Sequence, residues 1–457
     1  MLSGTGAHGA YHAGVLRALQ EAGVKLDIVA GHGIGAGGAA LAAIDGAARL
    51  WEPGGAWRSP AAERFYGWKR AIHAAAWICV ALLIVALIPV LMLALGLLVL
   101  PIGFLLEMLG IGAGSNLATG YSGWIEAAFA GRNLPTIVPR LALIVLGVLV
   151  LTLAAGAVAG ERRSHVRRRA AGGWWWRVLG APLDAEPVRQ QFAATIWELI
   201  RGAATLARPS SAILGRRYAE VLAENVGQPG FRELLIVAND LDARRDVVAA
   251  LLAEPFHREF LAPRPGRDRR SEVLDLNGIG RDHAIDVVLG ALTPPLVCDP
   301  HGLTYAPDSF WRGETHRLCD RPGALSRLLE EVAAAGATQV LVVSAVAPVG
   351  GPHRLQVPRL DIRSRLGEFL AAAESAALRD GMELARTRFD SVFVVCPGHN
   401  PVGPFDFAGA YDEASDRRQS LTELMERAYE DAYRQFIEPV IGGSGEQLAG
   451  AGVAQPE

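Results

Sequence analysis

The chain has 457 residues, which is enough for one large domain or for two or three smaller ones. Its formal net charge of −3 is close to neutral, so the overall charge gives no reason to expect a nucleic-acid partner. Its four cysteines are far apart and form no Cys-x-x-Cys pair, which argues against a zinc site or a disulfide framework, and we expect neither a metal nor a cofactor.

The first 46 residues predict a helix, a strand and a second helix joined by glycine-rich turns. Residues 9–22 place apolar side chains at helical spacing, and residues 26–30 form a short apolar strand. A helix rich in small residues is expected over about residues 36–46. The N-terminus has neither the basic region nor the apolar region of a signal peptide.

Two long runs without charge follow. Residues 74–106 and residues 141–160 contain no Asp, Glu, Lys or Arg, and about 20 apolar residues suffice to cross a bilayer. We therefore predict two transmembrane helices. The first run is too long for one straight crossing, and Pro89 and Pro101 would let it kink, tilt or split into a short hairpin.

Basic residues at the flanks of these runs predict the orientation. Lys69 and Arg70 precede the first run, and an arginine cluster follows the second. Its members are Arg162, Arg163, Arg167, Arg168 and Arg169. The positive-inside rule places both flanks in the cytoplasm, which makes the chain an integral membrane protein with one crossing per run. The cluster is also a candidate site for anionic lipid headgroups, and the tryptophans at 174–176 suit the membrane interface.

The remaining residues alternate between helices and apolar strands. Continuous apolar runs at 234–238, 339–345 and 391–396 are typical of strands that are covered on both faces, and helices are expected between and after them. This alternation predicts an α/β fold with a mainly parallel sheet. The expected organisation is a soluble part at 1–69 and 179–441, a two-span insert at 70–160, a basic, Trp-rich segment at 161–178 and a disordered tail at 442–457.

Two glycine-rich turns carry the candidate chemistry. Residues 3–9 (SGTGAHG) open a helix, where converging N–H groups suit a phosphate or a developing oxyanion. The second turn follows the strand at 26–30 and contains Gly31, His32, Gly33 and Gly35. A strand, a Gly-x-?-x-Gly turn and a helix have the layout of a nucleophile elbow.

Both turns, about 25 residues apart, resemble the patatin-like phospholipases. Residues 3–23 are similar to that family's SGGGxRG loop and first helix, and residues 26–43 are similar to its DxIxGTSAGA elbow. Residues 234–242 and 292–346 are similar to later family segments. The resemblance implies a three-layer α/β fold interrupted here by the transmembrane hairpin, and a lipid acyl hydrolase with a Ser–Asp dyad. It assigns the oxyanion loop to Gly4, Thr5 and Gly6, and the dyad aspartate to Asp308, with Asp406 as its rival.

This sequence departs from the family pattern at several of these positions. The nucleophile position falls on Gly33, which has no side chain, and His8 and Thr5 replace the family's basic residue and a glycine. The strand that should precede the oxyanion loop is expected to be missing, either because the start is too late or because the sheet has lost it. Ser3, Thr5, His8 and His32 are weaker candidates as substitute catalytic groups. Two hypotheses follow: a catalytically impaired membrane enzyme of phospholipase type, or a non-catalytic protein that binds or senses lipid or acts as a scaffold.

Overall fold

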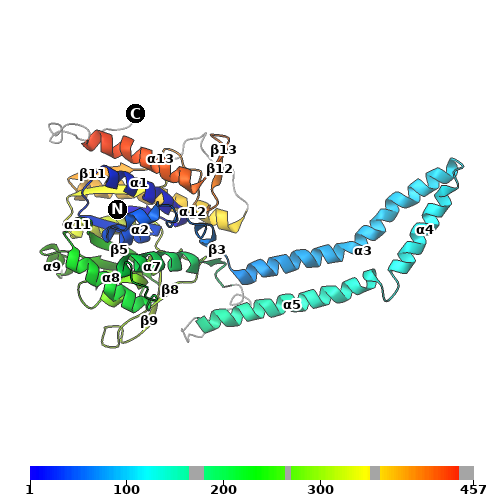
Figure 1. Ribbon diagram of the computed structural model, residues 1–457, viewed down its shortest axis with the longest axis horizontal. Helices are drawn as coiled ribbons and strands as arrows, with labels where there is room; N and C mark the ends of the chain where they lie inside the picture. Colours follow the sequence, from blue (N-terminus) through cyan, green and yellow to red (C-terminus); the bar gives the residue numbers. More distant parts are fainter. Residues whose placement is uncertain (164–179, 263–268, 350–360, 442–457) are drawn as a thin grey trace. The chain divides into compact units, whose positions relative to one another are not determined.

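The structure is a computed structural model that describes residues 1–163, 180–262, 269–349 and 361–441 (Figure 1). The chain divides into two compact units. One unit combines Met1–Gly67 with Leu183–Glu457, and the other is Trp68–Pro182. The first unit is therefore assembled from two segments that are separated in the sequence by the second.

A mixed, mostly parallel sheet forms the centre of the first unit. Its main strand order is β11-β10-β1-β2-β5-β6-β7, and a hairpin of β8 and β9 joins it through β5. The strands from β11 to β5 run parallel, and β6 pairs antiparallel with β5. The strands are β1 (Leu2–Gly4), β2 (Ile28–Gly33), β5 (Glu233–Asp240), β6 (Arg245–Leu251), β7 (Ser271–Asp275), β8 (His301–Thr304), β9 (Thr315–Cys319), β10 (Gln339–Ser344) and β11 (Ser391–Val395).

Helices cover both faces of this sheet and give three layers (Figure 1). Successive strand side chains point to opposite faces, so neighbouring residues such as Val29 and Ala30 enter two different cores. The larger core packs against α1, α2, α7, α8, α10 and α13, and the smaller against α9, α11 and α12. These helices are α1 (Gly9–Glu21), α2 (Ile34–Ala43), α7 (Glu186–Arg201), α8 (Ser211–Asn225), α9 (Phe256–Leu261), α10 (Ala284–Ala291), α11 (Leu325–Ala334), α12 (Ile362–Arg388) and α13 (Leu421–Ala432).

Short elements complete this unit. A capping box starts α13, since the Ser420 side chain accepts from the backbone of Glu423 while the Glu423 side chain accepts from the backbone of Ser420. The short helices are η1 (Gly6–His8), η2 (Ala47–Leu50), η3 (Ala62–Arg64), η4 (Arg281–His283) and the π-helical η5 (Tyr433–Ile441). Two small ribbons pair β3 (Gly67–Trp68) with β4 (Leu183–Asp184) and β12 (Ala410–Asp412) with β13 (Arg417–Gln419).

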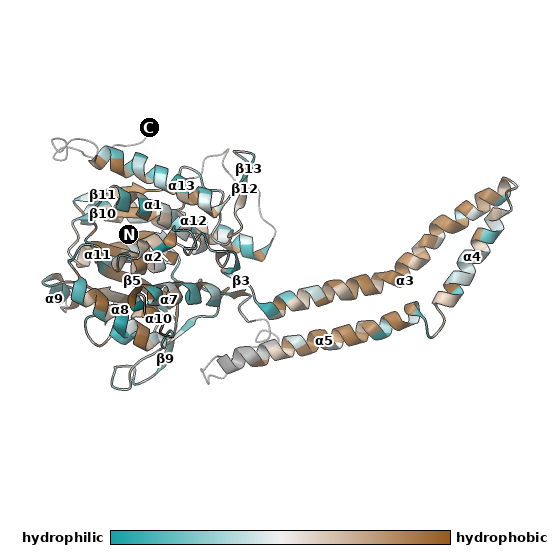
Figure 2. Cartoon of the chain, viewed as in Figure 1, coloured by the Kyte–Doolittle hydropathy of each residue, from teal (hydrophilic) through white to brown (hydrophobic). Residues whose placement is uncertain are grey.

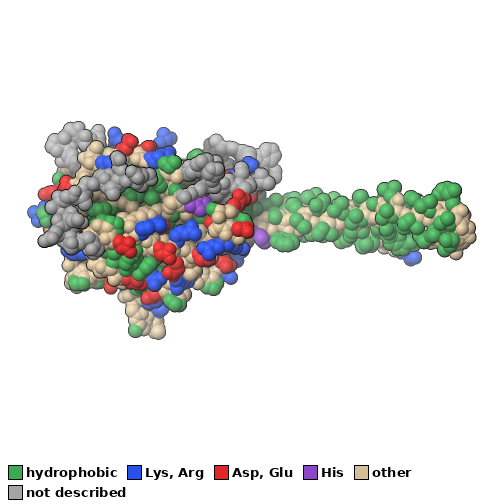
Figure 3. Space-filling view, turned by 90° about the horizontal axis from the view of Figure 1, so that it is seen from above, with side chains coloured by type: hydrophobic (Ala, Val, Ile, Leu, Met, Phe, Trp, Pro, Cys, Tyr) green, Lys and Arg blue, Asp and Glu red, His purple; other side chains and the backbone are tan. Residues whose placement is uncertain are grey.

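Long apolar helices make up the second unit. They are α3 (Arg70–Met108), α4 (Ala113–Ala128) and α5 (Leu134–Arg163). Figure 2 shows hydrophobic residues along most of α3 and α5, and Figure 3 shows hydrophobic side chains covering their visible surface. Two stretches, Arg70–Met108 and Leu134–Ala155, are long and apolar enough to cross a membrane. By length and composition they are candidate spans.

The structure excludes one of the three alternatives that the prolines of the first run leave open. Residues 70–108 form one helix that contains both Pro89 and Pro101, and the run does not split into a hairpin. At about 1.5 Å per residue its 39 residues extend about 58 Å, which is roughly twice the apolar thickness of a bilayer. The helix α4 then folds back along the second half of α3, and the hydroxyl of Tyr121 donates to the carbonyl of Met92 over 2.8 Å.

The expectation of a missing strand before the oxyanion loop is wrong. Residues 2–4 form β1, which lies in the middle of the sheet between β10 and β2. Three residues are enough because both neighbouring strands pair with them, Leu2 with Val343 and with Gly31. The glycine-rich loop therefore starts from a central strand.

Candidate active site

The predicted elbow is present between β2 and α2. Gly33 is the last residue of the strand and caps the helix, with φ 57° and ψ −135°. This left-handed conformation strains any residue with a side chain and is available to glycine at little cost. The backbone thus makes the sharp strand-to-helix turn that presents a nucleophile in enzymes with this motif.

The flanking glycines are required by close backbone approach. A Cβ at Gly31 would lie closer than 3.0 Å to the carbonyl of Gly35, and a Cβ at Gly35 would lie equally close to the carbonyl of Leu2. Real Cβ atoms essentially never show such separations. The backbone therefore leaves no room for a side chain at either position.

Backbone and carboxylate atoms occupy the space where the side chain of a nucleophile would start. A Cβ built on Gly33 would lie closer than 3.0 Å to the carbonyl oxygen of Gly4. It would also lie 3.0 Å from Oδ2 of Asp320. The C=O and N–H of a trans peptide point in opposite directions, so the N–H of Thr5 points away from the elbow while the Gly4 carbonyl points toward it.

Asp320 is the carboxylate at the elbow. It follows β9 directly, is only 1% exposed, and its backbone N–H donates to the carbonyl of Thr293 over 2.8 Å. The hydroxyl of Thr5 donates to its Oδ2 over 3.1 Å. The same oxygen that faces the Cβ position of residue 33 therefore receives a hydroxyl from the glycine-rich loop.

The other oxygen of Asp320 begins a buried chain of hydrogen bonds. Its Oδ1 lies 3.4 Å from Nδ1 of His32, and Nε2 of His32 lies 2.9 Å from the hydroxyl of Ser3. Nε2 of His12 lies 3.0 Å from the carbonyl of Ser3. Burial is the main cause that lowers the pKa of His12 to about 3, so this ring is neutral and Nε2 is its donor to Ser3. The side chains that form this series of hydrogen bonds are all buried.

The glycine-rich loop is held from outside by residue 404. The N–H of Ala7 donates to the carbonyl of Pro404 over 2.8 Å, so this N–H is already engaged within the protein and does not face a substrate. Gly6 has φ 60°, and a Cβ there would collide with the same carbonyl. The loop has the glycines that an oxyanion site needs, and two of its peptide groups are turned or engaged away from the elbow.

A second carboxylate lies on the far side of the loop. Nδ1 of His8 lies 3.1 Å from Oε2 of Glu374, and both side chains are 1% exposed. Burial alone would raise the pKa of Glu374, but the hydrogen bond with His8 and the charge of His8 outweigh it and lower this pKa. The Thr5 hydroxyl donates its one proton to Asp320, so His8 and Glu374 form a separate buried pair beside the network.

The two aspartates named from the sequence do not face Gly33. Asp308 lies in an exposed turn between β8 and β9, away from the buried elbow. Asp406 closes a turn by accepting from the N–H of Gly403 over 2.9 Å, as expected for a structural residue. The sequence motif did not identify Asp320, because the residues that follow it, Arg-Pro-Gly, do not resemble the family's Asp-Gly motif. Its place at the elbow comes instead from its position at the end of a buried strand. The one available signal was an aspartate directly after the apolar end of a strand.

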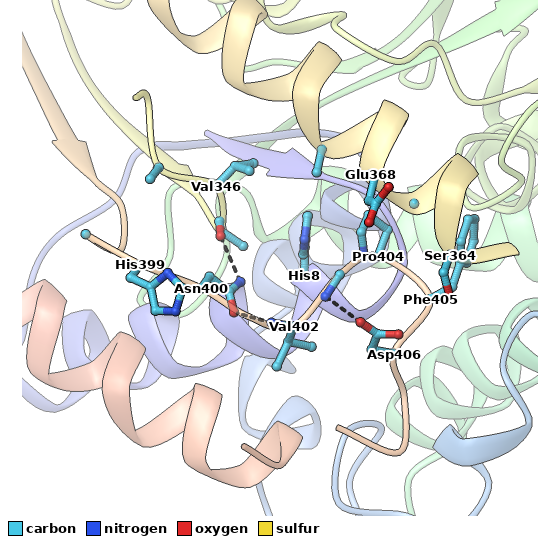
Figure 4. Close-up of a pocket in the computed structure, with 16 residues that line it drawn as sticks. His8, Val346, Ser364, Glu368, His399, Asn400, Val402, Pro404, Phe405 and Asp406 are labelled. Atoms are coloured by element: carbon cyan, nitrogen blue, oxygen red, sulfur yellow. Dashed lines mark hydrogen bonds between the residues drawn. The ribbon is translucent and has the colours of Figure 1, made fainter. Parts of the chain in front are cut away.

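A cavity of about 240 Å³ lies beside the network. Figure 4 shows His8 among its lining residues, with Val402, Pro404 and Asp406 on one segment and Ser364 and Glu368 on α12. Residues 345–347 after β10 complete its wall. His8 is therefore a buried residue that lines the inner end of the cavity.

Among the described residues, no three His, Cys, Asp or Glu side chains are arranged to hold a metal ion. Of the arginine cluster, Arg162 and Arg163 end α5, and residues 167–169 lie outside the described part of the chain, as do the tryptophans at 174–176. The predicted tail at 442–457 also lies outside it.

Comparison with known proteins agrees with the geometry. A comparison with curated proteins returned no match. The family model described as patatin-like phospholipase matches residues 1–254, which is more than half of the chain and includes both glycine-rich turns. With its three-layer sheet and its strand-turn-helix elbow, the chain belongs to the patatin-like phospholipase family.

Proposed function

We propose that this protein is a membrane-anchored member of its family that is catalytically impaired as a lipid acyl hydrolase. The observation that carries the proposal is Gly33: the nucleophile position has no side chain, and the Gly4 carbonyl lies where a side chain would begin. Acyl transfer through a serine elbow needs an oxygen at this point, and removal of such a group commonly costs several powers of ten in rate.

The state of the loop supports the same proposal. An oxyanion site needs N–H groups aimed at the developing charge. Here the Gly4 carbonyl faces the elbow, and the N–H of Ala7 is bonded to Pro404. A substrate carbonyl would meet another carbonyl at the elbow, which opposes binding in the productive position.

Membrane anchoring is supported by the second unit. Its two long helices expose apolar side chains along most of their length, and so large an exposed apolar surface is unfavourable in water. The basic residues at 69–70 and 162–169 favour a soluble domain on the cytoplasmic side. The protein would then meet lipid at the cytoplasmic surface, where the arginine cluster is a candidate partner for anionic headgroups.

The test of impairment is hydrolysis by the purified full chain in detergent, with p-nitrophenyl esters and a phospholipid as substrates. We expect no hydrolysis above the rate of a heat-denatured sample. Robust hydrolysis that Asp320→Asn abolishes would contradict the proposal and would point to another nucleophile, with Thr5 and Ser3 the nearest hydroxyls to the network.

The orientation is tested with cysteines added to a Cys79→Ser background. A membrane-impermeant maleimide applied to intact cells should label Asn116→Cys, which is exposed between the two spans, and should leave Glu413→Cys in the soluble unit unlabelled. The reverse labelling would contradict the cytoplasmic placement.

A non-catalytic role in lipid binding is the second candidate. It is favoured by the buried hydrogen bonds of Asp320, His32, Ser3 and Thr5 around the vacant position, and by the cavity nearby. Lipid binding without detectable hydrolysis would support this role, whereas slow turnover that depends on Asp320 would support an impaired enzyme.

A further inference from the structure

The insert is built as two pairs of helices. Figure 1 shows α5 beside the first half of α3 and α4 beside the second half, and α3 contacts both of them. A bend in α3 separates the two halves (Figure 1), and Pro89 lies within the helix, where a proline removes a backbone hydrogen bond and permits a kink. We call residues 70–89 with α5 the proximal pair, and residues 90–128 the distal pair.

A single crossing of the membrane accounts for the proximal pair alone. Residues 70–89 of α3 extend about 30 Å at about 1.5 Å per residue, which is the apolar thickness of a bilayer. The candidate span of α5, Leu134–Ala155, has 22 residues and extends about 33 Å. The distal pair therefore begins where the proximal pair has already reached the outer surface of the membrane.

The second half of α3 has the composition of a segment surrounded by lipid. Residues 90–106 contain no charged side chain, and Leu97 and Phe104 are largely exposed. In the described part of the chain, α4 covers one side of this stretch, where the hydroxyl of Tyr121 donates to the carbonyl of Met92. The other sides present apolar surface, which is unfavourable in water over such a length.

The helix α4 has a polar face and an apolar face on opposite sides. The polar side chains are exposed and recur at helical spacing. They are Ser115, Thr119, Ser122 and Glu126. Leu117 and Trp124 lie opposite, since at about 100° per residue Trp124 is about 200° round the helix from Ser122. A helix with these two faces lies in the plane of a membrane surface, with its indole at the interface.

We propose that the distal pair lies flat in the extracytoplasmic leaflet. The second half of α3 and the face of α4 that carries Leu117 and Trp124 contact lipid acyl chains, while the polar face of α4 contacts water. Residues 90–128 contain no Lys or Arg, so this contact does not depend on anionic headgroups. The proposal rests on the membrane anchoring proposed above and adds a second lipid-binding surface, on the side opposite the arginine cluster.

The test measures the depth of single nitroxide labels on the full chain in phosphatidylcholine nanodiscs. Cysteines are added to the Cys79→Ser background, and the signal of that background is subtracted. Oxygen concentrates among acyl chains and the nickel chelate Ni-EDDA in water, so the ratio of their collision rates reports depth. We expect this ratio to be at least about fivefold higher at Leu97→Cys and Phe104→Cys than at Thr119→Cys. Leu117→Cys is the matched control on α4 and should resemble Leu97→Cys.

Every other arrangement gives a different pattern and would overturn the proposal. Strong nickel access at Leu97→Cys and Phe104→Cys would show that the distal pair projects into water. Weak nickel access at Thr119→Cys, together with strong oxygen access, would show that the pair is immersed across the bilayer. Weak access of both reagents at Leu97→Cys and Phe104→Cys would show that protein covers α3, and spin–spin broadening would identify that protein as a second copy.

A label on the proximal pair separates failure of this proposal from failure of membrane anchoring. Leu83 is exposed on the first half of α3, so Leu83→Cys should have strong oxygen access and weak nickel access if the proximal pair spans the bilayer. Strong nickel access at Leu83→Cys would contradict anchoring itself. Lipid contact at Leu83→Cys with water contact at Leu97→Cys would contradict only the placement of the distal pair.

Discussion

At the scale of single residues, the atoms around the elbow leave little room for a side chain at residue 33. The turn at Gly33 has the strained dihedral angles of a nucleophile elbow, yet a Cβ built there lies closer than 3.0 Å to the Gly4 carbonyl and 3.0 Å from the Asp320 carboxylate. Close-packed interiors leave few voids, so an added side chain has to displace its neighbours. The return of a serine alone therefore meets an obstacle that the sequence does not reveal.

We expect Gly33→Ser to lower thermal stability and to leave hydrolysis undetectable. The new Cβ would collide with the Gly4 carbonyl in addition to the cost of a left-handed φ, and such overpacking costs about 1–3 kcal/mol. Gly23→Ser is the matched control, since Gly23 has φ 69° and open space around it, so only the backbone cost applies. Equal melting temperatures for the two variants, or strong esterase activity in Gly33→Ser, would contradict this expectation. Either result would show that the Gly4 carbonyl moves away at little cost in free energy.

The pKa of His12 gives a prediction for pH dependence. Burial lowers its pKa from 6.5 to about 3 in the folded state, so between these two pH values the unfolded chain binds a proton that the folded chain does not bind. The stability is complete above pH 6.5 and is lost as pH falls toward 3, by up to about 1.4 kcal/mol per pH unit. His8, His32 and Glu374 face the same ring and modify the slope.

The check is the free energy of unfolding of the full chain between pH 7 and pH 5, beside His12→Gln. Glutamine can keep a donor toward the carbonyl of Ser3 and does not titrate, so the variant should show a clearly shallower loss over this range. The same slope in both proteins would assign the pH dependence to other groups.

The candidate site could be predicted from the sequence only in part. Glycines at 31, 33 and 35 indicate the elbow, because neighbouring backbone carbonyls come so close that they leave no room for a Cβ at these positions. Asp320 could not be identified in this way, because its role depends on where β9 ends and on pairing across the sheet, and its local sequence had lost the family pattern. Asp308 had a more similar local sequence and lies in an exposed turn.

At the scale of elements, local patterns predicted β2, β5, β10 and β11 and missed other strands, among them the seven-residue buried strand β6. β5, β10 and β11 lie within a residue or two of the apolar runs at 234–238, 339–345 and 391–396, because burial on both faces demands continuous apolar sequence. The antiparallel additions β8 and β9 were missed because they alternate exposed and buried residues over only four or five positions. The helix α4 was missed because its polar and glycine-rich sequence owes its order to packing on α3.

Contact between α3 and α4 depends on glycines. A Cβ on Gly114 would collide with the carbonyl of Gly103, so the two helices approach at their backbones, as helices with small interface residues do in membranes. A Cβ built on Gly103 lies 3.7 Å from Cβ of Ala118. This separation is close to the mean of about 3.8 Å in disulfides.

We therefore expect Gly103→Cys with Ala118→Cys to form an intramolecular disulfide in detergent. Mass spectrometry of the non-reduced digest should detect the linked peptides. Gly103→Cys with Gly120→Cys is the control, because Gly120 has no neighbour within 4 Å outside its own helix. Linkage of the control pair alone would show that α4 packs on α3 in another register.

At the scale of the whole molecule, the insert interrupts the α/β unit at a narrow point. β3 pairs with β4, and the N–H of Lys69 donates to the carbonyl of Pro182 over 3.0 Å, so the two ends of the insert lie side by side. The α/β unit has its own cores on both sides of its sheet. It should not need the insert to fold.

Replacement of residues 70–181 by a Gly-Ser linker of about six residues should give a soluble, monodisperse protein. We expect a cooperative thermal transition and mixed α/β circular dichroism without detergent, whereas the full chain should need detergent to stay in solution. A deletion protein that aggregates, or that melts without cooperativity, would show that the insert supports the fold.

The central place of β1 has a consequence for biosynthesis. Residues 2–4 are synthesised before the other strands of the sheet, but their partner strand β10 ends at Ser344 and β11 ends at Val395, so the sheet cannot be completed until residue 395 has been synthesised. Both apolar helices emerge long before that point. In the proposed topology, the hairpin is therefore available to the bilayer while β1 and β2 still lack their partners β5 and β10, so membrane insertion would precede completion of the sheet.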